Sequence, residues 1–425
     1  MNSMDLLFGL VKIGVIFMFL ILGTKRLGMA PALGLGTLAF ALLSGLPLES
    51  YARVTKAVAT GSTFWYLEIM MLCLLTFIEV FVRSGQCDRM VHALEAYITS
   101  PRARLILFPM LLALLPAPGG AILSCPMVDS AGKNMEGLNQ ERLAVINYWF
   151  RHCLETMWPV YPGFILVCVM GSISMAELPL YTMPIALASV LGGWLFLLRG
   201  IRMADTAEDA QVKSVREVLA GGLPLLMIIG CGAACLALGK LTGLTVLSDW
   251  AFAIAPVLGT VSCLVMTGKG ISFVLRCVVS PKVRQILLLM VAIFYFKEFL
   301  AESHFIEPFV NVISSYNLLP LLFMIVPFVG GLAMGLYAGF VALCFPVLMP
   351  MLEASPALWD NRIAYVILAV AFGQMGQQLS PMHACFMFSC NYFKSHLGST
   401  WKRLLLPVSV VGIVSFCWFL VIRAA

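Results

Sequence analysis

Two interrupted apolar stretches hold the residues whose types could do chemistry. The first interruption brings together an arginine, an imidazole, a carboxylate and two aromatic side chains: Arg151, His152, Glu155, Trp158 and Tyr161. The second brings together three amides, a hydroxyl and an imidazole: Gln374, Gln377, Gln378, Ser380 and His383. Because proline cannot continue a helix, Pro159, Pro162 and Pro381 predict a non-helical break in each stretch. A half-helix that begins beyond a break offers free N–H groups and a positive dipole end, which suit a carboxylate or an oxyanion. We therefore expect these residues to contact a small anion.

The charged residues at the first interruption indicate ion coupling. Arg151 and Glu155 lie four residues apart, a spacing that lets two side chains pair on one helix face. A charged side chain inside a membrane costs free energy and usually has a function. We therefore expect Arg151, His152 and Glu155 to bind or transfer the coupling ion. The alternatives are a structural pair, or an Arg151 that reaches the membrane surface. Imidazoles titrate near neutral pH, so His152 and His383 could carry protons, or they could be hydrogen-bonded core histidines.

Two further apolar stretches, 104–130 and 318–350, are interrupted by glycine-rich segments at 116–120 and 335–339. We expect both to form re-entrant helical hairpins whose tips lie inside the protein, where broken backbone is tolerated in a membrane. Unwound carbonyls at the tips could hold a sodium ion near Gly119, Gly120 and Gly339. The substrate contacts expected from the two hairpins are Pro118, Gly119, Gly120, Ser124, Tyr337 and Gly339. The alternative is that these prolines and glycines only kink packed helices.

Composition places these segments in a lipid bilayer. Hydrophobic residues make up 61% of the chain and charged residues 11%, against roughly 25% charged in a soluble domain. The mean hydropathy is +0.97. The net charge of +6 is then expected to reflect basic cytoplasmic loops rather than a nucleic-acid partner. The 13 cysteines, mostly within apolar stretches, are interpreted as small hydrophobic residues.

Apolar stretches long enough to cross a bilayer predict about ten spans. They lie at about 6–23, 29–47, 63–82, 143–170, 178–198, 220–240, 250–268, 285–301, 362–390 and 403–422. Segment 86–98 is expected to form an interfacial helix. Most of the 27 lysines and arginines fall in cytoplasmic loops if both termini are periplasmic. The positive-inside rule therefore predicts a multi-pass protein of the cell inner membrane with this orientation.

The two halves of the chain are related in sequence. An offset of 219 residues relates Glu79 to Glu298, and the same offset relates Gly120 to Gly339 and Pro162 to Pro381. With an odd number of spans per copy, the second copy is inverted relative to the first. We predict an all-α membrane protein with repeat one at 1–199, a cytoplasmic linker at 200–217 and inverted repeat two at 218–425. Inverted repeats with broken helices at the bilayer midplane are typical of secondary transporters.

Several of these stretches resemble a known protein family. The stretches at 115–120, 125–129, 147–152, 158–163 and 379–394 resemble a prokaryotic integral membrane family of uncharacterised function. That family is placed in the ion transporter superfamily, with the divalent-anion/sodium symporters and the citrate, gluconate and arsenite permeases. The resemblance implies inverted repeats, re-entrant hairpins, a homodimer and elevator-type transport. The serine-asparagine-threonine tips of the divalent-anion symporters are absent here, so the resemblance does not extend to dicarboxylate specificity.

The expected function is ion-coupled secondary transport of a small organic anion. A sodium- or proton-coupled exchanger of an inorganic ion, or a non-transporting membrane partner protein, is the alternative. We expect no enzymatic activity, because the sequence contains no phosphate-binding P-loop, HExxH or GxSxG motif. No cofactor is expected beyond sodium or a proton as coupling ion, and the expected partners are the substrate, the lipid bilayer and a second copy of the chain.

Overall fold

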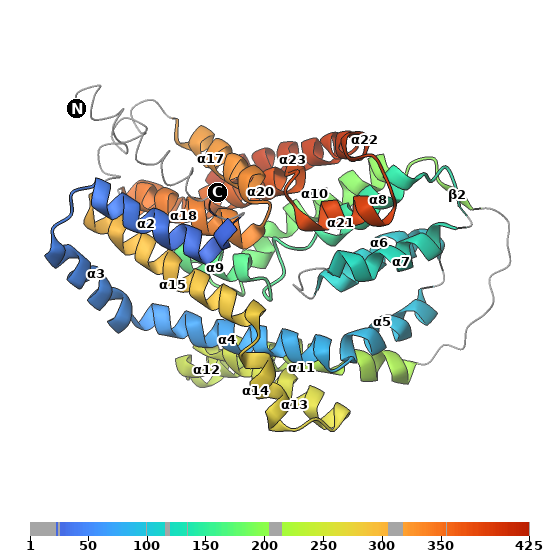
Figure 1. Ribbon diagram of the computed structural model, residues 1–425, viewed down its shortest axis with the longest axis horizontal. Coiled ribbons are helices and arrows are strands. Elements are labelled where there is room, and N and C mark those ends of the chain that lie inside the picture. Colours follow the sequence, from blue (N-terminus) through green and yellow to red (C-terminus); the bar gives the residue numbers. More distant parts are fainter. Residues whose placement is uncertain are drawn as a thin grey trace. The chain divides into compact units, whose positions relative to one another are not determined.

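A computed structural model describes residues 23, 26–98, 100–114, 120–133, 135–203, 215–304, 318–353 and 355–424 (Figure 1). Most of these residues are helical. One short antiparallel pair joins β1 (Met135–Glu136) to β2 (Arg202–Met203), with Met135 opposite Met203. The chain is thus an all-α membrane-type protein, as the sequence predicted.

Most of the helices lie within the predicted apolar stretches. In chain order they are α2 (Met29–Leu43), α3 (Leu48–Thr60), α4 (Ser62–Arg83), α5 (Gln86–Tyr97), α6 (Pro101–Ala113), α7 (Gly120–Gly132), α8 (Gln140–Arg151), α9 (Pro162–Met170), α10 (Leu178–Leu197), α11 (Val215–Thr242), α12 (Thr245–Asp249), α13 (Ala251–Thr267), α14 (Ile271–Val278), α15 (Pro281–Glu302), α17 (Leu319–Met334), α18 (Tyr337–Glu353), α19 (Pro356–Asp360), α20 (Arg362–Leu379), α21 (Ala384–Tyr392), α22 (Leu397–Lys402) and α23 (Leu405–Ala424). The first expected span, 6–23, lies almost wholly outside the described residues.

Five helical segments in the described part of the chain are long and apolar enough to cross a membrane. A sixth is added if α14 and α15, which meet at a 48° bend, form one span. This number is smaller than the ten predicted spans for three reasons. The span 6–23 lies almost wholly outside the described residues, the span 143–170 is divided between α8 and α9, and α2 and α13 are only 15 and 17 residues long. At 1.5 Å per residue, helices of that length cover roughly 22–26 Å, less than a bilayer core. The long apolar helices nevertheless identify a membrane protein.

The chain divides into two compact units, and each draws on both sequence halves. Unit 1 comprises Met1–Lys56, Arg104–Thr206 and Ala292–Ala425, and unit 2 comprises Ala57–Ala103 and Ala207–Val291. Both interruptions and both glycine-rich segments belong to unit 1. The candidate site can therefore be described within this unit alone.

The buried carboxylate of Glu79 in unit 2 pairs with two cationic side chains. Glu79 on α4 lies 2.8 Å from Arg83 Nε and 3.6 Å from Lys282 Nζ. The Glu79 side chain is only 7% exposed, whereas its two cationic partners are almost half exposed. A buried carboxylate that pairs with two partly exposed cations has a structural explanation.

Unit 1 is built around α20, whose residues are nearly all buried. α17 and α23 both pack against it, and α17 lies alongside α20 in Figure 1. The α17–α20 approach is close because glycines face each other. A Cβ added to Gly331 would lie 2.7 Å from the backbone nitrogen of Gln377, and one added to Gly376 would lie 2.9 Å from that of Leu332. Glycine at these positions lets the two backbones come into contact.

Candidate functional site

The first interruption is wider than its prolines alone predict. α8 ends at Arg151, and residues 152–161 form turns before α9 begins with Pro162 at its first position. Proline suits that position because the first helical N–H groups have no partner within the helix. Tyr161, the residue before α9, makes no side-chain hydrogen bond to these N–H groups. The N-terminus of α9 is therefore uncapped.

The second interruption is a short one at the end of α20. Ser380 is extended, with φ −68° and ψ 122°, as expected for a residue before proline. Its hydroxyl donates to the Leu332 carbonyl at 2.7 Å, which ties the break to α17. α21 then starts after His383, again with no side-chain cap. Two uncapped half-helices thus begin within unit 1.

The two interruptions are joined through Glu155. Its Oε1 lies 2.8 Å from His152 Nδ1, and its Oε2 accepts a 2.9 Å hydrogen bond from Gln377 Nε2. Gln374 Nε2 donates to the His152 carbonyl at 2.7 Å, so two amides of α20 hold the residues that follow α8. Glu155 is 5% exposed and Gln374 is fully buried. A carboxylate, an imidazole and two amides from opposite sequence halves form one buried network.

Glu155 has partners different from the one its spacing suggested. The prediction from the four-residue spacing required Arg151 and Glu155 to lie on one face of the same helix. Because α8 ends at Arg151, Glu155 lies in the turns beyond it and directs both oxygens to His152 and Gln377. Arg151 itself is buried, with 3% of its surface exposed.

Tyr148, which sequence reasoning did not single out, connects the same elements. Its hydroxyl donates to the Gln378 carbonyl at 3.0 Å. Its ring centroid lies 5.0 Å from that of His152 and 5.1 Å from that of His383. Tyr148 precedes His152 by four residues in the sequence, so a helical reading of α8 could have placed both on one face.

Replacing Tyr148 with phenylalanine should reduce the free energy of unfolding by about 1 kcal/mol, the scale of hydrogen bonds between membrane helices. The variant keeps the buried ring and removes only the hydroxyl that bonds the end of α20. Unfolding of the purified protein by graded denaturing detergent measures the effect. Tyr392→Phe, at an exposed tyrosine, is the matched control. Equal stability of the two variants would contradict this role for the hydroxyl.

Residues at the first interruption also contact the end of α6. Trp158 Nε1 donates to the Leu114 carbonyl at 2.9 Å, and the Tyr161 hydroxyl donates to the Ala113 carbonyl at 2.5 Å. The first glycine-rich segment follows directly in the sequence, but Pro118 and Gly119 lie outside the described residues. Gly120 is the first residue of α7.

The turn between α17 and α18 contacts both interruptions. A Cβ added to Gly335, which has φ +58°, would lie 3.0 Å from Ser380 Oγ. A Cβ added to Gly163 at the start of α9 would lie 2.6 Å from the Tyr337 ring and 2.9 Å from the backbone nitrogen of Ala338. This turn therefore lies against the start of α9 and the break before α21.

For two further predicted residues the structure gives other contacts. Ser124 is buried on α7 and donates to the Ala121 carbonyl at 3.2 Å. An added Cβ on Gly339 would meet the side chains of Met29 and Met334, so this side of Gly339 is apolar. Asn147, not predicted, links α7, α8 and α21 by donating to the Ala121 carbonyl and the Ser389 hydroxyl.

Several buried polar atoms near the breaks make no hydrogen bond within the described part of the chain. They are Gln374 Oε1, Gln377 Oε1, both amide atoms of Gln378, Thr156 Oγ1 and the Tyr337 hydroxyl. A buried polar atom without a partner costs about 1–3 kcal/mol. These atoms can therefore supply hydrogen bonds to a bound polar ligand at a net gain.

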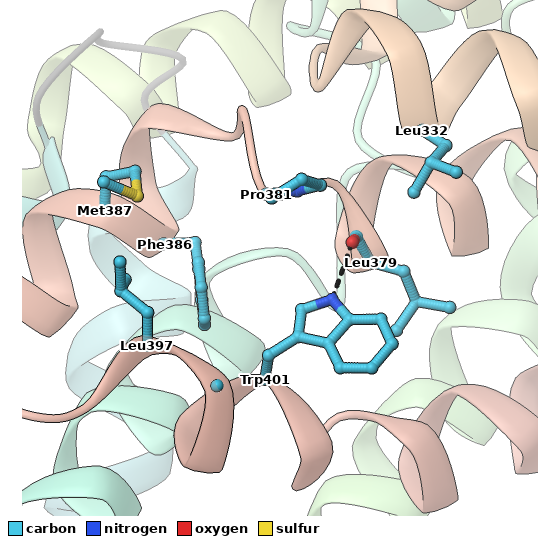
Figure 2. Close-up of a pocket in the computed structure, with 8 residues that line it drawn as sticks. Leu332, Leu379, Pro381, Phe386, Met387, Leu397 and Trp401 are labelled. Atoms are coloured by element: carbon cyan, nitrogen blue, oxygen red, sulfur yellow. Dashed lines mark hydrogen bonds between the residues drawn. The ribbon is translucent and has the colours of Figure 1, made fainter.

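An apolar pocket of about 280 Å³ borders the second break (Figure 2). Pro381 and Leu379 line one part, and Trp401 donates its indole N–H to the Leu379 carbonyl at 2.8 Å. The other lining residues are Leu332, Phe386, Met387, Leu397 and Gly398. None of these side chains is charged, so the pocket offers hydrophobic contacts and no ion site.

Comparisons with known proteins identify the family. No match to the sequence was found among curated proteins. A family model described as "Protein of unknown function (DUF401)" matches residues 3–422, nearly the whole chain. The chain therefore belongs to the DUF401 family.

Proposed function

We propose that the protein is an ion-coupled secondary transporter of a small organic anion. The observation that carries the proposal is the buried network in which Glu155 and His152, from the first break, bond Gln377 and Gln374, from the second. Broken helices from two sequence halves that meet at one polar site are the arrangement found in secondary transporters. The resemblance to the ion transporter superfamily supports the same reading.

Packing supports two equivalent halves. At the offset that relates Glu79 to Glu298, the run α6–α9 corresponds to α17, α18, α20 and α21. α7 packs against α21, and α18 packs against α9. Exchanged contacts of this kind arise when two copies are related by a two-fold axis. We propose that the copies are inverted repeats with re-entrant hairpins at α6–α7 and α17–α18.

The ligand chemistry favours an anion bound with the help of a proton or sodium. The uncapped starts of α9 and α21 supply N–H groups with a positive dipole end. Gln378 Nε2 and the hydroxyls of Thr156 and Tyr337 supply further donors, whereas the unpaired amide oxygens can only accept a hydrogen bond from the ligand. Glu155 and His152 form a hydrogen-bonded pair of titratable groups. This pair can gain or lose a proton when the coupling ion binds. The Glu155 carboxylate could also bind an inorganic cation, so the second candidate function is an exchanger of such an ion. A non-transporting scaffold gives no reason for buried unpaired amides.

Burial of the site fits a carrier rather than an open channel. Glu155, Gln374 and Gln377 are each at most 5% exposed, so a ligand reaches them only after a conformational change. We propose elevator-type alternating access in a homodimer of the cell inner membrane, with both termini periplasmic.

A ligand screen tests the function directly. The purified full chain should unfold at a higher temperature with one class of small carboxylate or oxyanion, and the shift should depend on sodium or on pH, because a ligand that binds only the folded state stabilises it. The same compound should then accumulate in proteoliposomes under the matching ion gradient. A ligand that binds but never accumulates, with either gradient and either orientation, would favour the non-transporting alternative.

A further inference from the structure

Three metal-ligating side chains from the two breaks lie together. His152 follows α8 in the first half, whereas His383 and Cys385 lie at the start of α21 in the second half. One ligand atom of each lies within 4.8 Å of the other two. The two imidazole rings meet edge to face, with centroids 4.4 Å apart. Both histidines are at least nine-tenths buried, at 3% and 4% exposure.

The imidazoles are oriented as in a metal site. Glu155 Oε1 binds the Nδ1 side of His152, which leaves Nε2 for another partner. His152 Nε2 and His383 Nδ1 are buried and make no hydrogen bond of normal geometry in the described part of the chain. The Cys385 thiol lies beside both imidazoles and interacts with each. Metal-binding histidines usually donate their other ring N–H to a carboxylate, a backbone carbonyl or a water, which fixes the ring, and Glu155 occupies that position for His152.

We infer that His152, His383 and Cys385 bind a borderline-soft divalent cation of the zinc class, which joins the two breaks. Two imidazoles and a thiolate suit Zn²⁺, Co²⁺ or Ni²⁺, whereas Mg²⁺ and Ca²⁺ prefer oxygen ligands. Binding releases the thiol proton of Cys385 to solvent. Three protein ligands leave a fourth position for water or another small ligand, as in zinc sites that exchange ligands. The inference needs no transport activity and stands independently of the proposed function.

Cobalt titration of the purified full chain, stripped with EDTA and desalted, tests the site. We expect saturable visible absorption of a four-coordinate Co²⁺ ion, with a thiolate-to-cobalt charge-transfer band, at about one ion per chain. Zn²⁺ should displace it and Mg²⁺ should not. Zn²⁺ should also raise the unfolding temperature of the wild-type chain, a readout that requires no variant. Absence of a saturable cobalt spectrum, or displacement by Mg²⁺, would overturn the inference.

Substitutions assign the ligands. Cys385→Ser should abolish the charge-transfer band, and His152→Gln and His383→Gln should each weaken Co²⁺ binding by at least about 10-fold. Cys417→Ser and His396→Asn, at an exposed cysteine and an exposed histidine, are the matched controls and should bind as the wild type does. An unchanged charge-transfer band in Cys385→Ser would exclude this site. The cobalt titration contains no substrate, so it tests the metal site alone. If the wild-type chain binds cobalt but takes up no anion, that result contradicts the proposed transport and leaves the metal site standing.

Discussion

Replacing Gly376 with alanine should lower the free energy of unfolding by about 3 kcal/mol, at the upper end of the cost of inserting one methyl group into a packed core. The added Cβ would lie 2.8 Å from the Phe328 carbonyl carbon, closer still to its oxygen, and 2.9 Å from the Leu332 backbone nitrogen. These are backbone atoms of α17, which cannot rotate away as a flexible side chain can. The helices must separate, and α17 carries both the Leu332 carbonyl that binds Ser380 and the turn that contacts both breaks. Graded unfolding in detergent, with recovery of monodisperse protein, measures the loss.

Gly230→Ala provides a matched control with the opposite sign. Gly230 lies on α11, and an added Cβ there meets nothing within 4 Å. Alanine is favoured over glycine in a helix by about 1 kcal/mol, so this variant should be as stable as the wild type or slightly more stable. If Gly376→Ala were equally stable, the close α17–α20 approach would not exist in the folded protein.

The breaks could be predicted from the sequence because proline acts locally. Ser380 precedes Pro381 and is extended, as steric contact with the proline ring requires. The first break shows the limit of this reasoning. Its prolines are Pro159 and Pro162, yet α8 ends at Arg151, well before either of them. No residue type marks that earlier end, which depends on the contacts of His152 and Glu155 with α20.

Partners across the two halves could not be predicted. Glu155 was expected to pair with Arg151 within one helix. Its partners are instead His152, three residues before it, and Gln377, more than 200 residues away in the sequence. Cys385 was interpreted as one small hydrophobic residue among many, because nothing in its local sequence indicates the neighbouring His152. The helix α3 was also not predicted, since Glu49, Arg53 and Lys56 make it too polar for a membrane span.

Glu155→Gln and Gln377→Ala should each reduce uptake of the ligand identified by the screen by about 10- to 100-fold. Hydrogen bonds to a charged group contribute about 1.5–3 kcal/mol, and 1.4 kcal/mol corresponds to a factor of ten in affinity. Glu155→Gln removes the charge that holds His152, while leaving a side chain of the same size. Gln377→Ala removes the amide that donates to Glu155 from the second half. The measurement is initial uptake into proteoliposomes, paired with ligand-induced stabilisation of the same preparations.

The controls separate a site defect from general damage. Glu353→Gln and Gln140→Ala remove a carboxylate and an amide at exposed positions and should transport as the wild type does. The two site variants should remain extractable and monodisperse, because each leaves the packing of α17 on α20 intact. A double variant should be no worse than the more impaired single variant, because Glu155 and Gln377 share one hydrogen bond and their effects overlap. If both single variants still bind and transport like the wild type, the ligand site lies elsewhere, and the network around Glu155 serves only to join the two broken helices.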